Sequence, residues 1–573
     1  MSIQRVTVCA AALVAISGCS MEGGTIAPSG TKERNSAEME FIALHDAYLA
    51  KYKPLLLRSE KAWWVANTTG SDEAFEAKKQ AENALIELHS DRETFAGLKA
   101  LKDGGRVTDA VLARQLDVMY RTFLPGQVDP AVQKRIVDIQ TEVEKIFNTH
   151  RSRVGGKQMT ENDVRKILSD TKDSALAEEA WKGYMAVGAK VEAKLKELVA
   201  LRNQVARQLG FRDFYVMSCT LQEIDEGELL RLFDELDDLT REPFAALKRD
   251  IDTAMAARFG IASGDLRPWN FGDLFFQETP GMEAVNLDSV FADQDLLALV
   301  KKYYASLDMP VEAILARSDM YEKPGKSPHA FCTDLDRTGE DVRVLCNLKP
   351  NLYWMDTIMH EVGHAVYDTY IRRDLPFLLH EASHSITTEG VAMMFGAFVK
   401  NGDWLRRVRG LSPGEAESVV RSARRALRAE KLVFSRWTQV MVRFEYGMYT
   451  NPDQDLGKLW WDLKKRYQLL SPPETVHRPD YAAKVHVITV PVYYHSYMMG
   501  DLFASQLRAH IARKVMGLAD VSSTSFYGSR DAGRFLKEHV FGPGNLYSWN
   551  ELTRRATGEP LSARAFVRQY VAE

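Results

Sequence analysis

Two histidines four residues apart constrain this chain more than any other feature of its sequence. His360 and His364 lie in the stretch MHEVGHAV, residues 359–366. On a helix, positions i and i+4 share one face, so both imidazoles can bind one metal ion. A catalytic zinc site needs a third protein ligand and one open position, and Glu389, 25 residues beyond His364, is a suitable carboxylate. We therefore predict that one Zn²⁺ is bound by His360, His364 and Glu389, beside Glu361.

The sequence contains a second copy of this motif, His380-Glu381-Ala382-Ser383-His384. The position one helix onward from this copy is Arg409, and residues 406–408 offer no ligand either. A guanidinium at that position would repel a metal cation. The first copy has uncharged flanking residues, as a buried metal helix requires, and the carboxylate of Glu389 follows it. The first copy is therefore the predicted site.

The composition is that of an ordinary globular protein. The 573 residues are 45% hydrophobic and 27% charged. The net charge of -4, without long blocks of one sign, argues against nucleic-acid binding as the main task. Apolar residues recur at helical spacing along most of the chain. We predict a mainly α fold in which two helical subdomains flank a deep central cleft, with residues 36–573 forming a single helical domain that contains the predicted zinc site.

The N-terminus looks like the signal of an exported bacterial lipoprotein. Arg5 precedes an apolar run, residues 6–16, which is too short to span a bilayer, and small residues lead to Cys19. Residues 1–19 are thus predicted to be a signal that leaves Cys19 lipidated, and residues 20–35 a flexible tether. A plain secretory signal is the alternative, and it too would export the protein. Ser20 favours anchoring at the periplasmic face of the outer membrane over the inner membrane.

The remaining cysteines fall into two kinds. Cys332 and Cys346 flank a predicted turn at residues 336–339, so they are candidates for a disulfide in an oxidising compartment. Cys219, between a serine and a threonine, is expected to be a buried free thiol.

Two further stretches contain, respectively, a predicted strand and a cluster of polar and aromatic side chains. Residues 341–348 alternate in polarity and predict a short strand just before the metal helix. The edge of such a strand can bind an extended peptide, although a purely structural hairpin has the same pattern. Residues 484–497, KVHVITVPVYYHSY, contain lysine, histidine and tyrosine side chains that can bind anionic groups. Aromatic residues at the start of an apolar helix are also typical of core packing.

An ordered set of further motifs resembles the angiotensin-converting-enzyme family of zinc peptidyl-dipeptidases along most of the chain. The zinc motif alone is shared by many peptidases, whereas the ordered set is specific. Besides that motif, the set comprises residues 62–68, 201–211, 272–277, 374–376, 460–461, 466–468 and 471–473, together with Trp549 and Thr557-Gly558.

The resemblance implies catalytic roles for three residues. Glu361 is similar to the family's general base, which takes the proton of the attacking water. His486 and Tyr497 are similar to the donors that stabilise the transition-state oxyanion. The ligands His360, His364 and Glu389 match those of the family when counted from Asp374-Leu375-Pro376.

The resemblance also implies how substrate is bound. His329 and Ala330 would hold the substrate backbone. Gln277, Lys484 and Tyr494 would bind the C-terminal carboxylate, so the substrates would be short peptides with a free C-terminus. A buried cation two residues beyond the metal would select for release of C-terminal dipeptides.

This sequence departs from the family pattern in three places. Met393 stands where the family usually has an aspartate that supports a zinc histidine. Ser496 stands where chloride-activated members have arginine. One extra residue precedes Tyr494, so Tyr493 is an alternative to Tyr494 in carboxylate binding.

Two other functions remain open at this point. The Glu389-Gly390 pair and the tyrosine run at residues 493–497 also resemble the thimet-type zinc oligoendopeptidases, which would cleave peptides internally. A catalytically silent peptide-binding lipoprotein is the third hypothesis, but Glu361 and all three predicted ligands are retained.

Overall fold

The computed structural model describes residues 34–280 and 288–571. The predicted signal, Cys19 and nearly all of the predicted tether lie outside the described residues. Among the helices in the described part, none has both the length and the hydropathy of a membrane span.

Helices dominate the described residues, and only two short hairpins interrupt them. The helices before the first histidine motif are α1 Ser36–Thr69, α2 Asp72–His89, α3 Arg92–Gly104, α4 Ala110–Phe123, α5 Pro130–Thr149, α6 Glu161–Asp170, α7 Ser174–Gln208, α8 Phe214–Leu221, α9 Glu226–Phe259, α10 Leu296–Ser306 and α11 Glu312–Arg317. The later helices are α12 Leu352–Thr369, α13 Ser385–Ala397, α14 Gly402–Trp404, α15 Pro413–Thr450, α16 Leu456–Gln468, α17 His486–Thr489, α18 Tyr494–His510, α19 Arg530–Phe535, α20 Trp549–Thr557 and α21 Arg564–Tyr570. The strands are β1 Ser152–Val154, β2 Lys157–Met159, β3 Phe331–Asp334 and β4 Val342–Leu345.

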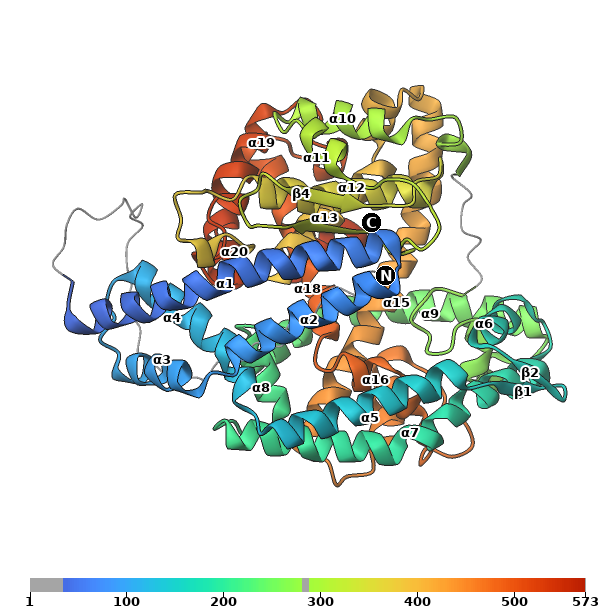
Figure 1. Cartoon of the computed structure of the whole chain (residues 1–573). Helices are drawn as coiled ribbons and strands as arrows, with labels where there is room; N and C mark the ends of the chain where they lie inside the picture. The colour runs from blue at the N-terminus through green and yellow to red at the C-terminus, as the bar shows by residue number, and fades with distance from the viewer. Residues whose placement is uncertain (1–33, 281–287, 572–573) are drawn as a thin grey trace.

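The helices lie in two groups (Figure 1). One group contains α5 to α9 and α16, and the other contains α10 to α13, α19 and α20 with the hairpin of β3 and β4. The long helix α15 packs against α9 and α16 of the first group and against α14 and α18. Both strands of the β3 and β4 hairpin contact α12. The predicted mainly helical class, with a small β element beside the metal helix, is confirmed.

The two hairpins differ in how far the sequence predicted them. The strand expected at residues 341–348 is β4, which pairs antiparallel with β3 so that Phe331 faces Leu345. The hairpin of β1 and β2 was missed because three-residue strands are too short to show alternation. Its turn uses Gly155 and Gly156, which have φ of 56° and 77°.

The predicted disulfide between Cys332 and Cys346 is wrong, since both thiols are free. The register of the hairpin places Val344 opposite Cys332, so Cys346 is its diagonal neighbour. Diagonal Cα atoms on one face lie about 7–8 Å apart, beyond the span that a disulfide normally bridges. Cys219 is a buried free thiol, as predicted.

Two glycines allow α13 to pack closely between α12 and α18. A Cβ at Gly363 of α12 would lie 2.9 Å from the Cα of Ala392 in α13. A Cβ at Gly390 would lie 2.6 Å from the Phe503 ring and 2.9 Å from the carbonyl oxygen of Gly500 in α18. Both helices therefore approach the backbone of α13 at distances that only glycine permits.

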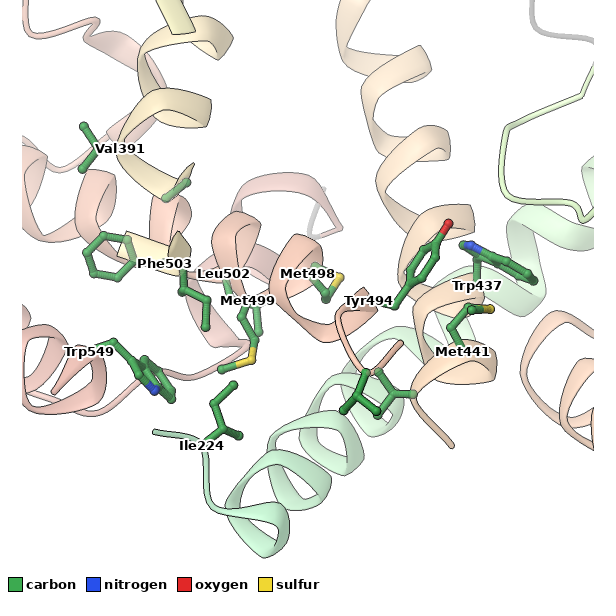
Figure 2. Close-up of a cluster of buried hydrophobic side chains, with 14 of the residues drawn as sticks. Ile224, Val391, Trp437, Met441, Tyr494, Met498, Met499, Leu502, Phe503 and Trp549 are labelled. Atoms are coloured by element: carbon green, nitrogen blue, oxygen red, sulfur yellow. The ribbon is translucent and has the colours of Figure 1, made fainter. Parts of the chain in front are cut away.

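The central helix α18 is buried on most of its surface, as a helix in the middle of a large core must be. Figure 2 shows its side chains Met498, Met499, Leu502 and Phe503. On one side lies Val391 of α13, and on the other lie Trp437 and Met441 of α15. Ile224 and Trp549 lie in the lower part of the same cluster. This packing fixes the orientation of the tyrosines at the start of α18.

The C-terminal end of α1 is fastened to the segment that leads into β3. Gly70 ends α1 with φ 67°, and a Cβ there would lie 2.1 Å from the carbonyl oxygen of Gly325. The backbone N–H of Ser327 donates to the carbonyl of Asn67 over 2.8 Å. The segment just before His329 and Ala330 therefore moves with α1.

The close packing of α13 predicts the effect of one added methyl group. Gly390→Ala should lower the free energy of unfolding by about 1–3 kcal/mol, because the methyl group meets a ring and a backbone carbonyl of α18. The measurement is denaturant unfolding followed by circular dichroism. Gly414→Ala is the matched control, since no atom lies within 4 Å of its added Cβ. Equal midpoints for the two variants would contradict this account of the packing.

Candidate active site

The predicted metal ligands meet between α12 and α13. Asn351 begins α12 by accepting a hydrogen bond from the N–H of Trp354. The Nε2 atoms of His360 and His364 lie 3.2 Å apart. The Glu389 Oε2 atom lies 3.5 Å from Nε2 of His360 and 3.8 Å from that of His364. In the described part of the chain, these are the only three His, Cys, Asp or Glu residues grouped closely enough to hold a metal ion.

This donor set fits zinc. Zinc bonds of 2.0–2.1 Å in a tetrahedron place two nitrogens about 3.3 Å apart, close to the spacing of the two imidazoles. Two nitrogens and one carboxylate oxygen leave the fourth position for water or substrate, as in catalytic zinc sites. The three residues could therefore hold a zinc ion with little movement.

Burial favours the neutral forms of the groups around this point. It lowers the pKa of His360 to about 4 and that of His364 well below its usual value. Neutral imidazole is the form that ligates metals. Burial also raises the pKa of Glu389 to about 7, and burial together with the neighbouring Glu389 raises the pKa of Glu361 to about 8. A bound cation would favour the ionised carboxylates.

His364 has a hydrogen-bond partner that the sequence did not reveal. Its Nδ1 atom lies 2.7 Å from the Thr388 hydroxyl. With Nδ1 bonded in this way, the Nε2 lone pair faces the predicted metal position. Thr388 directly precedes Glu389, so α13 supplies both a ligand and a support for a second ligand. In the sequence, a threonine before a glutamate does not by itself indicate a hydrogen bond to a metal-binding histidine.

The second histidine motif has a structural role instead. His380 follows a short turn, Phe377–Leu379, and its Nε2 bonds the carbonyl of Leu375 over 2.7 Å. Glu381 pairs with Arg337. His384 is the N-cap of α13, where its ring nitrogen accepts from the N–H of Ile386. The two histidines of this copy therefore do not share a helix face.

The three residues predicted to bind a carboxylate lie together. Nζ of Lys484 donates to Oε1 of Gln277 over 2.8 Å. The same ammonium lies over the ring of Tyr494, 5.4 Å from its centroid, and over the rings of Phe275 and Trp437. Lys484 is 6% exposed, and its burial lowers its pKa to about 8. Phe275 and Trp437, which sequence reasoning missed, thus enclose a desolvated cation.

The tyrosines at the start of α18 lie in two parts of the site: Tyr494 is near Lys484, and Tyr493 and Tyr497 are near Glu389. Tyr494 packs against Trp437 and His486 on the Lys484 side. Tyr493 and Tyr497 stack edge to face, and the Glu389 carboxylate adds to burial in raising the pKa of each hydroxyl. Tyr493 is therefore on the metal side, and Tyr494 is the tyrosine beside the lysine.

His486 lies beside Tyr494, on the Lys484 side of the site. It begins α17, and its ring lies 5.2 Å from that of Tyr494. Burial, aided by the charge of Lys484, lowers its pKa to about 4. Its Nδ1 atom is buried without a hydrogen-bond partner among the described residues. A neutral imidazole with a free nitrogen can serve as a hydrogen-bond donor to substrate.

The strand β3 lies beside Glu361, whose charge acts on the thiols of Cys332 and Cys346. Ala330 directly precedes β3, and β3 pairs only with β4 within the described ranges, so its other edge is open. His329 lies on the exposed loop before Ala330. Across residues 34–280 and 288–571 its side chain makes no hydrogen bond to another predicted site residue.

Together, the helical fold, the two imidazoles and the carboxylate define a helical protein with a candidate metal site of the His-Glu-x-x-His type. The profile of the M2 peptidases, described as angiotensin-converting enzyme, matches residues 34–257 and 276–572. The chain therefore belongs to the angiotensin-converting enzyme family.

Curated relatives support the assignment at low sequence identity. Angiotensin-converting enzyme of Sus scrofa is 22% identical over 539 residues, which is 88% of this chain and 40% of that protein. The enzyme of Oryctolagus cuniculus is 23% identical over 89% of this chain and 41% of its own length. The angiotensin-converting enzyme-like protein Ace3 of Mus musculus is 23% identical over 71% of this chain and 59% of its own length. The chain thus spans less than half of the two enzymes.

Substitution of the glutamate associated with each histidine motif should affect zinc affinity differently. Glu389→Gln should lower zinc affinity at least about tenfold, because it removes an anionic ligand. Glu381→Gln should leave affinity unchanged, because that carboxylate pairs with Arg337. Both are measured by metal analysis after dialysis against a chelator of known affinity. Loss of zinc from the Glu381 variant alone would reverse the assignment.

Proposed function

We propose that the protein is a zinc-dependent peptidyl-dipeptidase that releases C-terminal dipeptides from oligopeptides. The observation that carries the proposal is the buried ammonium of Lys484, which is bonded to Gln277 and lies over Tyr494. A desolvated cation with polar neighbours is a recognition element for a carboxylate. Membership of the angiotensin-converting enzyme family and the fit of the metal ligands support the same activity.

The chain's own residues supply the proton transfers and hydrogen bonds. When bound, zinc polarises a peptide carbonyl and makes water nucleophilic near neutral pH. Glu361 takes the proton of the attacking water and returns it to the leaving amine, as a general base and then a general acid. The Tyr497 hydroxyl and the His486 ring donate to the oxyanion, and each such donor is worth about 3 kcal/mol in comparable sites. Ala330 and the open edge of β3 would hold the substrate backbone.

The distance between the two halves of the site would set the cleavage position. Lys484, Gln277 and Tyr494 fix the substrate's terminal carboxylate, and Glu361 fixes where the carbonyl is attacked. A buried cation left unpaired is costly, so substrates without a free carboxylate should bind poorly. The substrate class is therefore short peptides with a free C-terminus.

We also propose that the enzyme is exported from the cytoplasm and anchored to a membrane. Its support is the lipoprotein-like signal at residues 1–19, with Cys19 as the lipid attachment site and Ser20 favouring the periplasmic face of the outer membrane. A lipid on Cys19 would hold the domain near the membrane through residues 20–35.

The carboxylate site predicts a clear difference between paired substrates. Mass spectrometry of the products should show C-terminal dipeptides from free-acid peptides and little cleavage of the amidated versions. Lys484→Ala should lower kcat/KM for free-acid peptides about 10²-fold and change that for amides far less. Lys458→Ala, an exposed lysine on α16, is the control and should change neither. Internal cleavage that tolerates the amide would instead identify an oligoendopeptidase.

Titration of Lys484 predicts a pH dependence specific to free-acid substrates. Burial lowers the pKa of Lys484 to about 8, so the ammonium is present below that pH and lost above it. The ratio of kcat/KM for a free-acid peptide to that for its amide should therefore fall as pH rises through about 8, because kcat/KM reports the free enzyme. Lys484→Arg should keep the ratio constant, since arginine stays charged. A constant ratio in the wild type would contradict the role of Lys484.

A further inference from the structure

The two predicted zinc histidines are not supported in the same way. The ring of His364 is bonded through Nδ1 to Thr388, but within the described ranges no hydrogen bond reaches Nδ1 of His360. The Nε2 atom of His360 faces His364 and Glu389, so Nδ1 lies on the other side of the ring. Metal-bound histidines almost always donate this second N–H, usually to a carboxylate or a carbonyl.

Asp356 lies on the same face of α12 as His360, one turn earlier. Its Oδ2 atom accepts a hydrogen bond from Nζ of Lys400 over 2.8 Å. Its Oδ1 atom accepts none from any described residue. A Cβ at Gly396 of α13 would lie 2.6 Å from this Oδ1 and 3.5 Å from the Cβ of His360. The carboxylate and the imidazole are therefore neighbours where α13 crosses α12.

Both groups line the same cavity of about 160 Å³, together with Met393 and Lys400. Met393 is on α13 four residues after Glu389, but its thioether is only a weak acceptor. Glu430 and Asp501 also line this cavity, but Glu430 lies on α15 and both oxygens of Asp501 accept from Lys431. Asp356 is the carboxylate that lies one turn from His360 on the same helix and keeps an oxygen that no described residue bonds.

We propose that Asp356 is a positioning residue for the metal site, whose Oδ1 accepts the Nδ1–H of His360 while Lys400 holds its Oδ2. This bond keeps the proton on Nδ1 and turns the Nε2 lone pair toward the metal. The inference rests on the zinc site of the proposed function. In this proposal, the residue that supports His360 comes from α12, the helix that contains His360. Position 393 on α13 cannot supply this support because Met393 has no carboxylate.

Lys400 has a defined part in this arrangement. Its bond to Oδ2 neutralises the carboxylate and limits its rotation. Gly396 keeps the space beside Oδ1 open, since any side chain there would displace the carboxylate. The support of His360 therefore needs three residues: Asp356 of α12, Gly396 of α13 and Lys400 of the short turn Phe398–Lys400 that follows α13.

The test measures zinc affinity of the full protein after metal removal, by competition with a chromogenic chelator. Asp356→Asn should weaken zinc binding about 10- to 100-fold, and Asp356→Glu should recover part of the loss. Asp462→Asn is the matched control, because Asp462 also pairs with a lysine but lies exposed on α16. It should bind zinc as the wild type does.

A second readout separates positioning from a general structural role. The unfolding midpoint of the metal-free Asp356→Asn variant should stay close to that of the metal-free wild type, while the visible spectrum of its cobalt form changes. A lowered midpoint with an unchanged cobalt spectrum would overturn the inference. Wild-type zinc affinity in Asp356→Asn would overturn it as well.

His360→Ala distinguishes failure of this inference from failure of the proposed function. If His360→Ala weakens zinc binding and Asp356→Asn does not, the zinc site stands and the positioning role is refuted. If His360→Ala itself binds zinc normally, the metal site is elsewhere and both proposals fail.

Discussion

The contact between α12 and α13 is the constraint on which the site depends. Gly363 lets the backbone of α13 approach at Ala392, and the approach brings Glu389 to within 3.8 Å of both imidazoles. Three polar groups, one buried and two partly buried, that converge without a charge of opposite sign lose hydration and gain little in return. A divalent cation at the point of convergence would remove this penalty, so the helix contact and metal binding would stabilise each other.

The helix α18 connects the half of the site that contains the predicted metal ligands to the half that contains Lys484. Tyr494, the first residue of α18, and Tyr493, its N-cap, face different halves, because Tyr493 has non-helical backbone angles (φ -128°, ψ -18°). Tyr493 approaches Glu389, whereas Tyr494 approaches Lys484. Since α18 is enclosed by α13, α15 and α20, a shift of one half would be transmitted to the other through a rigid core.

Local patterns in the sequence were enough to predict the helical class and the grouping of His360, His364 and Glu389. The spacing of His360 and His364 is a direct consequence of helix geometry, and a ligand such as Glu389 can be sought at the next helix. The failures were features that depend on contacts between distant segments. The register that separates Cys332 from Cys346, the Thr388 bond to His364 and the aromatic enclosure of Lys484 by Phe275 and Trp437 have no periodicity that a sequence displays. The choice between Tyr493 and Tyr494 also needed the rotation of α18 about its axis.

The junction between α1 and the segment before β3 has a mechanical consequence. The glycine pair at positions 70 and 325 leaves no room for a gap, and the hydrogen bond from Ser327 to Asn67 joins the two backbones directly. The C-terminal end of α1 therefore cannot move independently of residues 325–327. Any outward movement of this helix end would draw the segment that leads to His329 and Ala330 with it, so the two form one mechanical unit.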